Sequence, residues 1–542
     1  MSIHSPTHCR LVMGPARCRL CRLSVARLGT MMRRLAAGSR VLLLGLGLGV
    51  GMAARAAAPL ADLIEAGDTR AALALLTVGA EVNAAQPDGS TALLWAVYHV
   101  DEALVATLLQ READPDLGNR FGATPLAEAA KLGHAGLVRQ LLEAGAAPDS
   151  ANADGQTPLM LVAGNGSLAS AEALLAAGAN VNAVEQWTGQ TALMWAAAGR
   201  HADMVALLVA HGAAVNARAT PFDWSSQITS EPRGQYRPAG GLTPLLYAAR
   251  SGCLACVETL LQAGADPDLP TPEGVTPLLS AIESTEFGIA NRLLDAGADP
   301  HSFDWWGRTP LYLAIDVRSI ASRGQQLDRA RRDLALRLAE RLLAAGVYVD
   351  PQMNFHRPGP GGGNGRYADE LLTTGTTPLL RAAVGHDAEA ARLLLQHGAR
   401  VDLPNIFGIT PLIAVAGIAT PRGLLSDGSV FPEPDIEDLV IATLDVLLEA
   451  GADINAVITD TTSYTAEWPR HASISNRQGQ TAIYGPGKWG WLRVAEYLVE
   501  HGARTDVVDF YGKTPVDSAL AKAGGEQEET YPALAAYLEA RH

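Results

Sequence analysis

A tripeptide of threonine, then proline or alanine, then leucine recurs along this chain of 542 residues and constrains its fold more than any other feature. The threonines lie at positions 91, 124, 157, 191, 243, 276, 309, 377 and 410, with the variants Thr-Ala-Ile at 481 and Thr-Pro-Val at 514. Seven of the ten intervals between them are 33 or 34 residues. A period of this length is typical of a repeat protein, in which each small unit stacks on its neighbours.

One repeat predicts two short helices. The hydroxyl of Thr191 is placed to cap the first helix, and Gly199 interrupts the helical pattern. Residues 202–210 carry apolar side chains at the spacing of a second helix, which Gly212 ends in the left-handed conformation. A single helix pair cannot bury its own apolar stripe, so the units are expected to form one continuous core.

The segment TPLLYAARSGCLACVETLLQAGADPDL, from Thr243 to Leu269, resembles the ankyrin repeat, whose pattern is T-P-L-H-x-A-A, a second helix ending in L-L, and then G-A-D-x-N. The resemblance covers about residues 59–540. It implies an all-α ankyrin-repeat solenoid, a curved elongated stack of 33-residue helix-turn-helix units joined by β-turn or hairpin fingers. The sequence departs from the family where its histidine is replaced by apolar residues such as Leu94 and Met160, so apolar contacts are expected there.

The period divides residues 57–542 into about twelve repeats. A partial capping repeat covers 59–87, and the others begin near 88, 121, 154, 188, 240, 273, 306, 374, 407, 478 and 511. The three long intervals predict finger insertions at 217–240, 350–376 and 456–479, and inter-helix insertions at about 318–334 and 417–437.

The N-terminal region is expected to be a targeting sequence. Arg33 and Arg34 precede an apolar run of 14 residues, and small residues follow it. This order is that of a secretory signal peptide at 31–56, cleaved after Ala56. Residues 1–30 are then a dispensable or non-native extension, with translation starting at Met31 or Met32. The prediction is a periplasmic or secreted protein with no stable membrane span after cleavage; an inner-membrane protein anchored by an uncleaved signal is the alternative.

The charge of the chain argues against nucleic acid as a partner. The whole chain has 42 Lys and Arg against 57 Asp and Glu, but residues 1–58 contain nine arginines and no acid. The remainder therefore has 33 basic against 57 acidic residues. A body with this excess of acids repels the phosphate backbone, whose neutralisation supplies most nucleic-acid affinity.

No motif in the sequence indicates catalysis, a cofactor or a metal site. The GPGKWG segment at 485–490 lacks the spacing of a phosphate-binding loop. Cys253 and Cys256 replace the histidine and the first valine of the G-H-x-x-V-V pattern of the family that the chain resembles, and small buried thiols are the favoured interpretation; a local disulfide is the alternative in an oxidising compartment. No cofactor, metal or catalytic residue is therefore predicted.

Aromatic residues and one arginine in the fingers are the candidate partner-binding residues, because these residue types anchor protein interfaces. They are Phe121, Trp187, Phe222, Trp224, Tyr236, Trp305, Trp306, Phe355, Arg357, Tyr367, Phe407, Trp468 and Tyr511. A second set, Trp95, Trp195 and Tyr247, lies four residues after the repeat threonine, and core packing is the favoured role for it.

These features predict a non-catalytic scaffold or adaptor, exported from the bacterial cytoplasm, that binds a partner protein through its concave face and its long fingers. A monomer is favoured. One alternative is an enzyme or small-ligand binder whose site is built from the insertions. Another is a secreted effector that acts on host proteins.

Overall fold

The computed structural model describes residues 58–223, 238–319, 328–354, 374–418, 436–459, 477–520 and 531–541. The chain divides into two units, 1–55 and 56–542, and every described residue belongs to the second unit. The predicted signal peptide and the extension before it lie outside the described residues.

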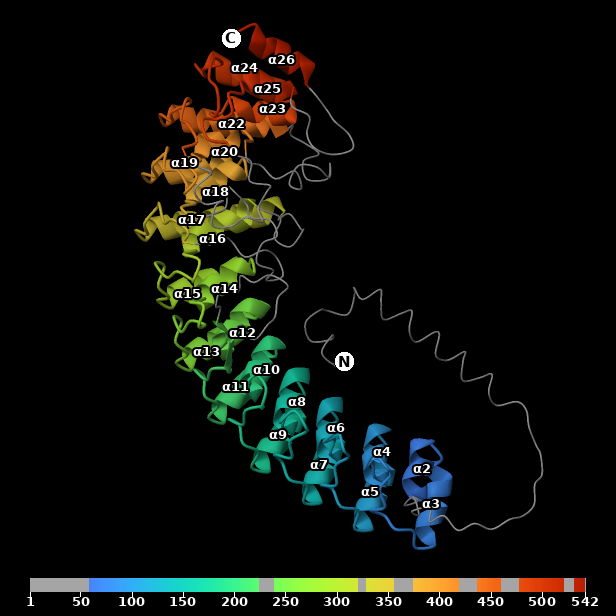
Figure 1. Ribbon diagram of the computed structural model, residues 1–542. Helices are drawn as coiled ribbons and strands as arrows, with labels where there is room; N and C mark the ends of the chain where they lie inside the picture. The colour runs from blue at the N-terminus through green and yellow to red at the C-terminus, as the bar shows by residue number, and fades with distance from the viewer. Residues whose placement is uncertain are drawn as a thin grey trace, which may run out of the picture. The chain divides into compact units, whose positions relative to one another are not determined.

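The described residues form twenty-four helices that follow one another in twelve pairs (Figure 1). The first helices of the pairs are α2 (Pro59–Glu65), α4 (Ala92–Tyr98), α6 (Pro125–Leu132), α8 (Pro158–Asn165), α10 (Ala192–Ala198), α12 (Pro244–Ser251), α14 (Pro277–Glu283), α16 (Pro310–Ser319), α18 (Pro378–Val384), α20 (Pro411–Val415), α23 (Tyr484–Trp489) and α25 (Pro515–Leu520). The second helices are α3 (Thr69–Thr77), α5 (Glu102–Gln110), α7 (Ala135–Glu143), α9 (Leu168–Ala176), α11 (Ala202–Ala210), α13 (Leu254–Gln262), α15 (Phe287–Asp295), α17 (Arg329–Ala344), α19 (Ala388–Gln396), α22 (Ile436–Glu449), α24 (Leu492–Glu500) and α26 (Pro532–Glu539). This architecture of stacked helix pairs confirms the predicted fold class.

Most repeat threonines cap the first helices as predicted, but α23 begins after Ile483 and has no side-chain cap. The Thr91 hydroxyl accepts a hydrogen bond from the Leu94 amide at 3.2 Å, and Thr243 accepts one from Leu246 at the same distance. Each bond satisfies an amide that has no partner inside its helix. Beyond the second helix, Gly212 has φ of +84°, a left-handed conformation that a residue with a Cβ adopts only at a cost.

One continuous core runs through the pairs. Each first helix packs against its own second helix, and most first helices also pack against the first helix of the next pair, as α4 does against α6. The apolar residues that replace the family's histidine are buried: Leu94 is 6% exposed, and Met160 and Ile413 are fully covered. Apolar packing therefore takes the place of the polar contacts that histidine would make.

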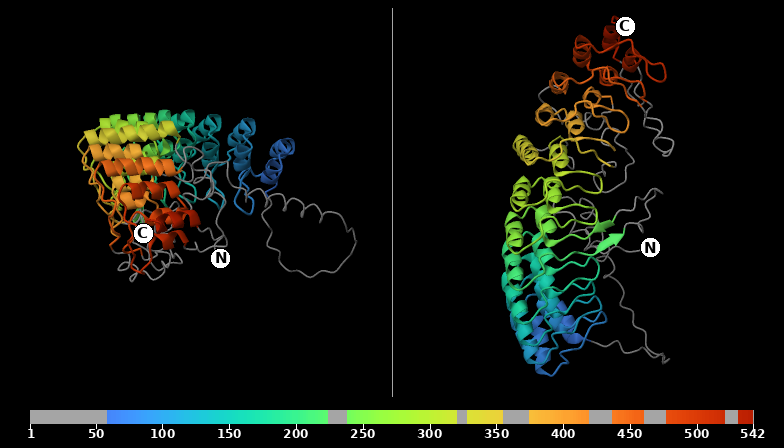
Figure 2. Two further views of the ribbon diagram at one scale, coloured as in Figure 1. Left: turned by 90° about the horizontal axis from the view of Figure 1, so that it is seen from above. Right: turned by 90° about the vertical axis from the view of Figure 1, so that its left-hand side faces the viewer.

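A row of side-chain to backbone hydrogen bonds links the fingers of successive pairs. Asp116 accepts a bond from the amide of Ala147 at 2.9 Å, and Asn182 accepts one from Ala214 at 2.8 Å. In a later repeat, His301 stands at the position that Asp116 and Asn182 hold in theirs. Each bond satisfies a loop amide and fixes the register between neighbouring pairs. Figure 2 shows the loops leaving the helix rows along one edge.

The predicted insertions are partly described. The finger insertion at 217–240 begins and ends in a two-stranded antiparallel sheet, β1 (Pro221–Asp223) with β2 (Pro238–Gly240), in which Phe222 lies opposite Ala239. The predicted inter-helix insertions are too long at their C-terminal ends. Helix α17 begins at Arg329 and spans 16 residues, and α22 begins at Ile436 and spans 14, whereas α11 has nine. Part of the extra sequence therefore lengthens the second helices, because its apolar residues continue the helical period.

Candidate functional site

The finger turns place the predicted aromatic residues. The Asn119 side chain accepts hydrogen bonds from the amides of Phe121 at 3.0 Å and Ala123 at 3.1 Å, which closes the turn. Gly122 follows at φ of +74°, where a Cβ would come within 2.3 Å of the Ala153 amide nitrogen of the next finger. Only glycine allows these two backbones to approach so closely. The aromatic residue two positions after the acceptor is thereby held at the tip.

Glu185 takes the place of this asparagine in a later finger. Its carboxylate accepts hydrogen bonds from the Trp187 amide at 2.7 Å and the Thr188 amide at 2.6 Å. Burial by itself would raise the pKa of Glu185, but the hydrogen bonds from Thr188, Gln190 and Trp187 outweigh burial and hold that pKa below its ordinary value. The ionised form therefore stabilises this finger at neutral pH, and the contribution is lost as the pH falls through the folded-state pKa.

Four of the predicted finger residues reach the surface. Phe121 is 72% exposed, Trp187 73%, Tyr511 63% and Trp305 41%. Phe510, another aromatic residue of the last finger, is 62% exposed beside Tyr511. Phe121, Trp187 and Trp305 lie at the tips of three short fingers, and Phe510 and Tyr511 lie at the tip of the last finger of the chain. A partner protein can contact all of these side chains.

Two of the predicted residues are buried instead. Trp306 is 5% exposed and clusters with Tyr312 and Met353, and Phe407 is 3% exposed within the main core. Both precede a lengthened finger, and the start of that finger lies against them: the Asn354 amide bonds to the Trp306 carbonyl at 2.8 Å, and Thr459 lies next to Gly408. As surface anchors these two predictions are wrong, because the next finger covers them.

The remaining predicted residues lie outside the described structure. They are Trp224, Tyr236, Phe355, Arg357, Tyr367 and Trp468, and the side chain of Phe222.

The aromatic residues of the first helices are half-buried. Trp95, Trp195 and Tyr247 pack one side against the core and leave the other side accessible, so core packing describes only part of their role. Trp195 lies over Gly164 of the preceding first helix, where a Cβ would be 2.9 Å from the indole. The Tyr247 hydroxyl accepts a hydrogen bond from Gln190 at 2.8 Å, and burial raises the pKa of this tyrosine. We call the surface formed by these residues and their equivalents on the other first helices the first-helix face.

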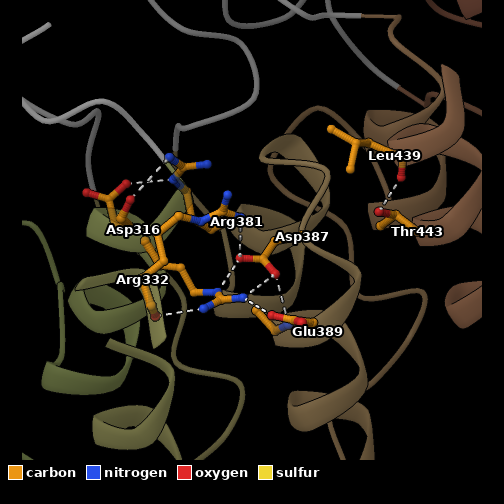
Figure 3. A network of polar contacts seen from close by, with 9 residues as sticks. Asp316, Arg332, Arg381, Asp387, Glu389, Leu439 and Thr443 are labelled. Atoms are coloured by element: carbon orange, nitrogen blue, oxygen red, sulfur yellow. Dashed lines mark hydrogen bonds and ion pairs between the residues drawn. The ribbon is translucent and has the colours of Figure 1, made fainter. Parts of the chain in front are cut away.

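A buried ionic network further along the chain was not predicted (Figure 3). Arg381 is fully covered and donates from Nε to Asp316 Oδ1 at 2.6 Å, and Asp316 is 1% exposed. Arg381 lies four residues after Thr377, in the position that Trp95, Trp195 and Tyr247 occupy in their own repeats. A charged residue at a position that three repeats fill with Trp or Tyr was the signal that could have identified it.

A second arginine of this network joins two repeats across an insertion. Arg318, at the end of α16, donates to Asp387 Oδ2 at 2.5 Å, to the Arg332 carbonyl at 2.6 Å, and to Glu389. Arg318 therefore connects the end of α16 with α17, across the inter-helix insertion, and with the start of α19. Nearby, burial lowers the pKa of His386 to about 4, so its ring is neutral at physiological pH. Arg381 and Arg318 are each paired with carboxylates, and these pairs connect neighbouring repeats.

Cys253 and Cys256 are joined in a disulfide at the start of α13. Both side chains are buried, at 6% and 0% exposure, and Cys253 also accepts a hydrogen bond from the Cys256 amide. The structure thus contains the alternative that the sequence analysis ranked second.

The disulfide predicts the result of a peptide-mapping experiment. Trypsin releases both cysteines in one peptide, 251–292, because no lysine or arginine lies between Arg250 and Arg292. After alkylation under denaturing, non-reducing conditions, this peptide is expected to carry no alkyl group, and after reduction it should carry two. Two alkyl groups without reduction would show that the thiols are free in the native protein.

Within the described part of the chain, no three side chains of histidine, cysteine, aspartate or glutamate gather as a metal ion would require. No described helix is long and apolar enough to cross a membrane.

The stacked helix pairs, capped by threonine and joined by hydrogen-bonded fingers, define a helical repeat protein with an accessible aromatic face. Comparison with known families agrees: a model of three ankyrin repeats matches residues 60–152, 126–219 and 230–304, and a single-repeat model matches 374–406. The chain is an ankyrin repeat protein. A search of curated protein sequences gave no significant match. Ankyrin repeats are generally modules of protein–protein interaction.

Proposed function

We propose that this ankyrin repeat protein is a non-catalytic scaffold, exported from the bacterial cytoplasm, that binds a partner protein through its first-helix face and its fingers. The observation that carries the proposal is the exposure of large aromatic side chains at the finger tips, foremost Phe121 at 72% and Trp187 at 73%. Large apolar groups in water cost free energy, and clusters of them mark interaction surfaces.

The first-helix face extends this surface. Trp95, Trp195 and Tyr247 each offer one accessible side on helices that pack in a row. Aromatic side chains contribute large contact areas at little entropic cost and dominate the energies of protein interfaces. The finger and helix residues are also connected, since Gln190 at the base of one finger bonds to Tyr247.

Export rests on the sequence order of basic residues, an apolar run and small residues before Pro59. The first described helix, α2, begins at Pro59, so cleavage after Ala56 would leave that helix complete. A periplasmic or secreted location is the one we propose. N-terminal sequencing of the mature protein tests it, with an N-terminus at Ala57 expected and an intact leader contradicting it.

Site-specific photo-crosslinking in the producing cell tests the scaffold role. A photoreactive phenylalanine analogue at position 187 is expected to capture a discrete protein partner, because Trp187 projects into solvent at a finger tip. The matched control places the same group at Val78, which is 78% exposed at the end of α3. Capture of the same proteins from both positions, or of no protein from position 187, would refute the proposed surface.

A further inference from the structure

The first-helix face carries acidic and aromatic residues side by side at the N-terminal end of the described repeats. Successive first helices pack together, so their equivalent positions form columns. Asp62 and Glu65 of α2 hold the positions that Trp95 and Tyr98 hold on α4. A carboxylate pair therefore lies next to an aromatic pair on neighbouring helices.

The aromatic residues of α4 form a compact cluster. The rings of Trp95 and Tyr98 meet edge to face at 5.6 Å between centroids, and His99 contacts Tyr98 at 5.5 Å and Trp95 at 6.3 Å. Tyr98 is 53% exposed. The negative face of an aromatic ring attracts a cation, most strongly when carboxylates lie nearby.

Gln86 connects the carboxylates to the indole. Its carbonyl oxygen accepts a hydrogen bond from Trp95 Nε1 at 2.7 Å, while its Nε2 donates to Asp62 at 2.8 Å and to Glu65 at 2.7 Å. Two like charges thus share one neutral donor, and among the described residues neither carboxylate has a lysine or arginine partner. A cation placed there would be attracted by both carboxylates, which Gln86 already holds beside the aromatic rings.

The carboxylate on the other side of the aromatic pair differs. Glu128, on α6, forms an ion pair with Lys131 at 3.4 Å. The surrounding repeats are also strongly acidic, with 13 Asp and Glu against 5 Lys and Arg in residues 58–152. Long-range attraction and local uncompensated charge therefore favour the same kind of ligand, a cationic one.

We propose that the surface of Asp62, Glu65, Trp95, Tyr98 and His99 binds the lysine or arginine side chains of a basic peptide segment in the partner protein. This inference rests on the scaffold function proposed above and specifies the partner's chemistry. The carboxylates pair with the cationic head group, while the rings pack against its face and its aliphatic stem.

Fluorescence anisotropy with the full chain and a labelled decapeptide of alternating arginine and alanine tests this assignment. A decapeptide of alternating glutamate and alanine, which should not bind, is the control. Tyr98→Ala is expected to weaken binding of the basic peptide about tenfold, and the pair Asp62→Asn with Glu65→Gln by at least about tenfold with a weaker salt dependence. Trp95→Phe keeps a ring in the core and should also weaken binding, which guards against loss of folding in a truncated variant.

The matched control removes the same two charges elsewhere, by Glu172→Gln and Asp203→Asn on the second helices α9 and α11. It should change affinity less than about twofold. The proposal would be overturned if both pairs of charge variants weakened binding of the basic peptide equally and Tyr98→Ala had no effect. The peptide would then be attracted only by the net negative charge of the protein. The scaffold role is judged separately: if position 187 captures a partner equally well in the Asp62/Glu65 variant, that role stands and this inference falls.

Discussion

Asp316→Ala is expected to lower the free energy of unfolding of the surrounding repeats by about 3–5 kcal/mol, because it leaves the Arg381 guanidinium charged and without its carboxylate in the protein interior. Asp316 and Arg381 are 1% and 0% exposed and are joined at 2.6 Å. An arginine cannot relieve the charge by losing its proton at any ordinary pH. The loss should appear in hydrogen exchange as reduced protection of α16 and α18, since distant repeats unfold separately.

Two controls separate the buried charge from other effects of the substitution. Asp295→Ala removes the partner of Arg341 from an ion pair at the surface, where the side chains are 60% and 37% exposed, and should cost only about 0–1 kcal/mol. Replacing both buried partners, as Asp316→Leu with Arg381→Met, should recover most of the stability lost in Asp316→Ala. A cost for Asp316→Ala no larger than that for Asp295→Ala would contradict the argument.

The fold was predictable because its signals are local. The Thr191 hydroxyl accepts a hydrogen bond from the Met194 amide, three residues further along the chain, and Gly212 ends the next helix through its own backbone conformation. These signals recur in most repeats and can be read within one period, although Glu112 holds the left-handed position after α5 and α23 begins without a threonine cap. Even the bounds of the second helix, 202–210, agree with the structure.

The site was only partly predictable because burial depends on the neighbouring repeat. Trp187 and Trp306 both follow a turn acceptor by two residues, yet one is 73% exposed and the other 5%. The difference lies in Met353, which belongs to the following finger and packs on Trp306. Arg381 likewise finds Asp316 65 residues earlier in the chain, across an insertion. No pattern inside one repeat specifies such a pairing.

Gly485→Ala is the second substitution with a large expected effect. Gly485 lies in α23, and a Cβ there would stand 1.9 Å from the Ala416 carbonyl oxygen and 2.5 Å from its carbon. These are backbone atoms at the end of α20, so no side-chain rotation can make room, and the two first helices must separate. Overpacking of this kind costs about 3 kcal/mol or more. Hydrogen exchange should show the loss of protection in α23 and α24, with α4 to α11 unchanged.

Gly288→Ala supplies the matched control for this prediction. Gly288 lies in the second helix α15, and a Cβ there meets nothing within 4 Å. The same added methyl group should therefore be neutral or stabilise the protein by about 0.5 kcal/mol, because alanine is the better helix former. If the two variants unfold alike, the contact between α23 and the end of α20 is not as close as described. If only Gly485→Ala unfolds early, a single missing methyl group sets how closely the helix pairs beginning with α20 and α23 approach.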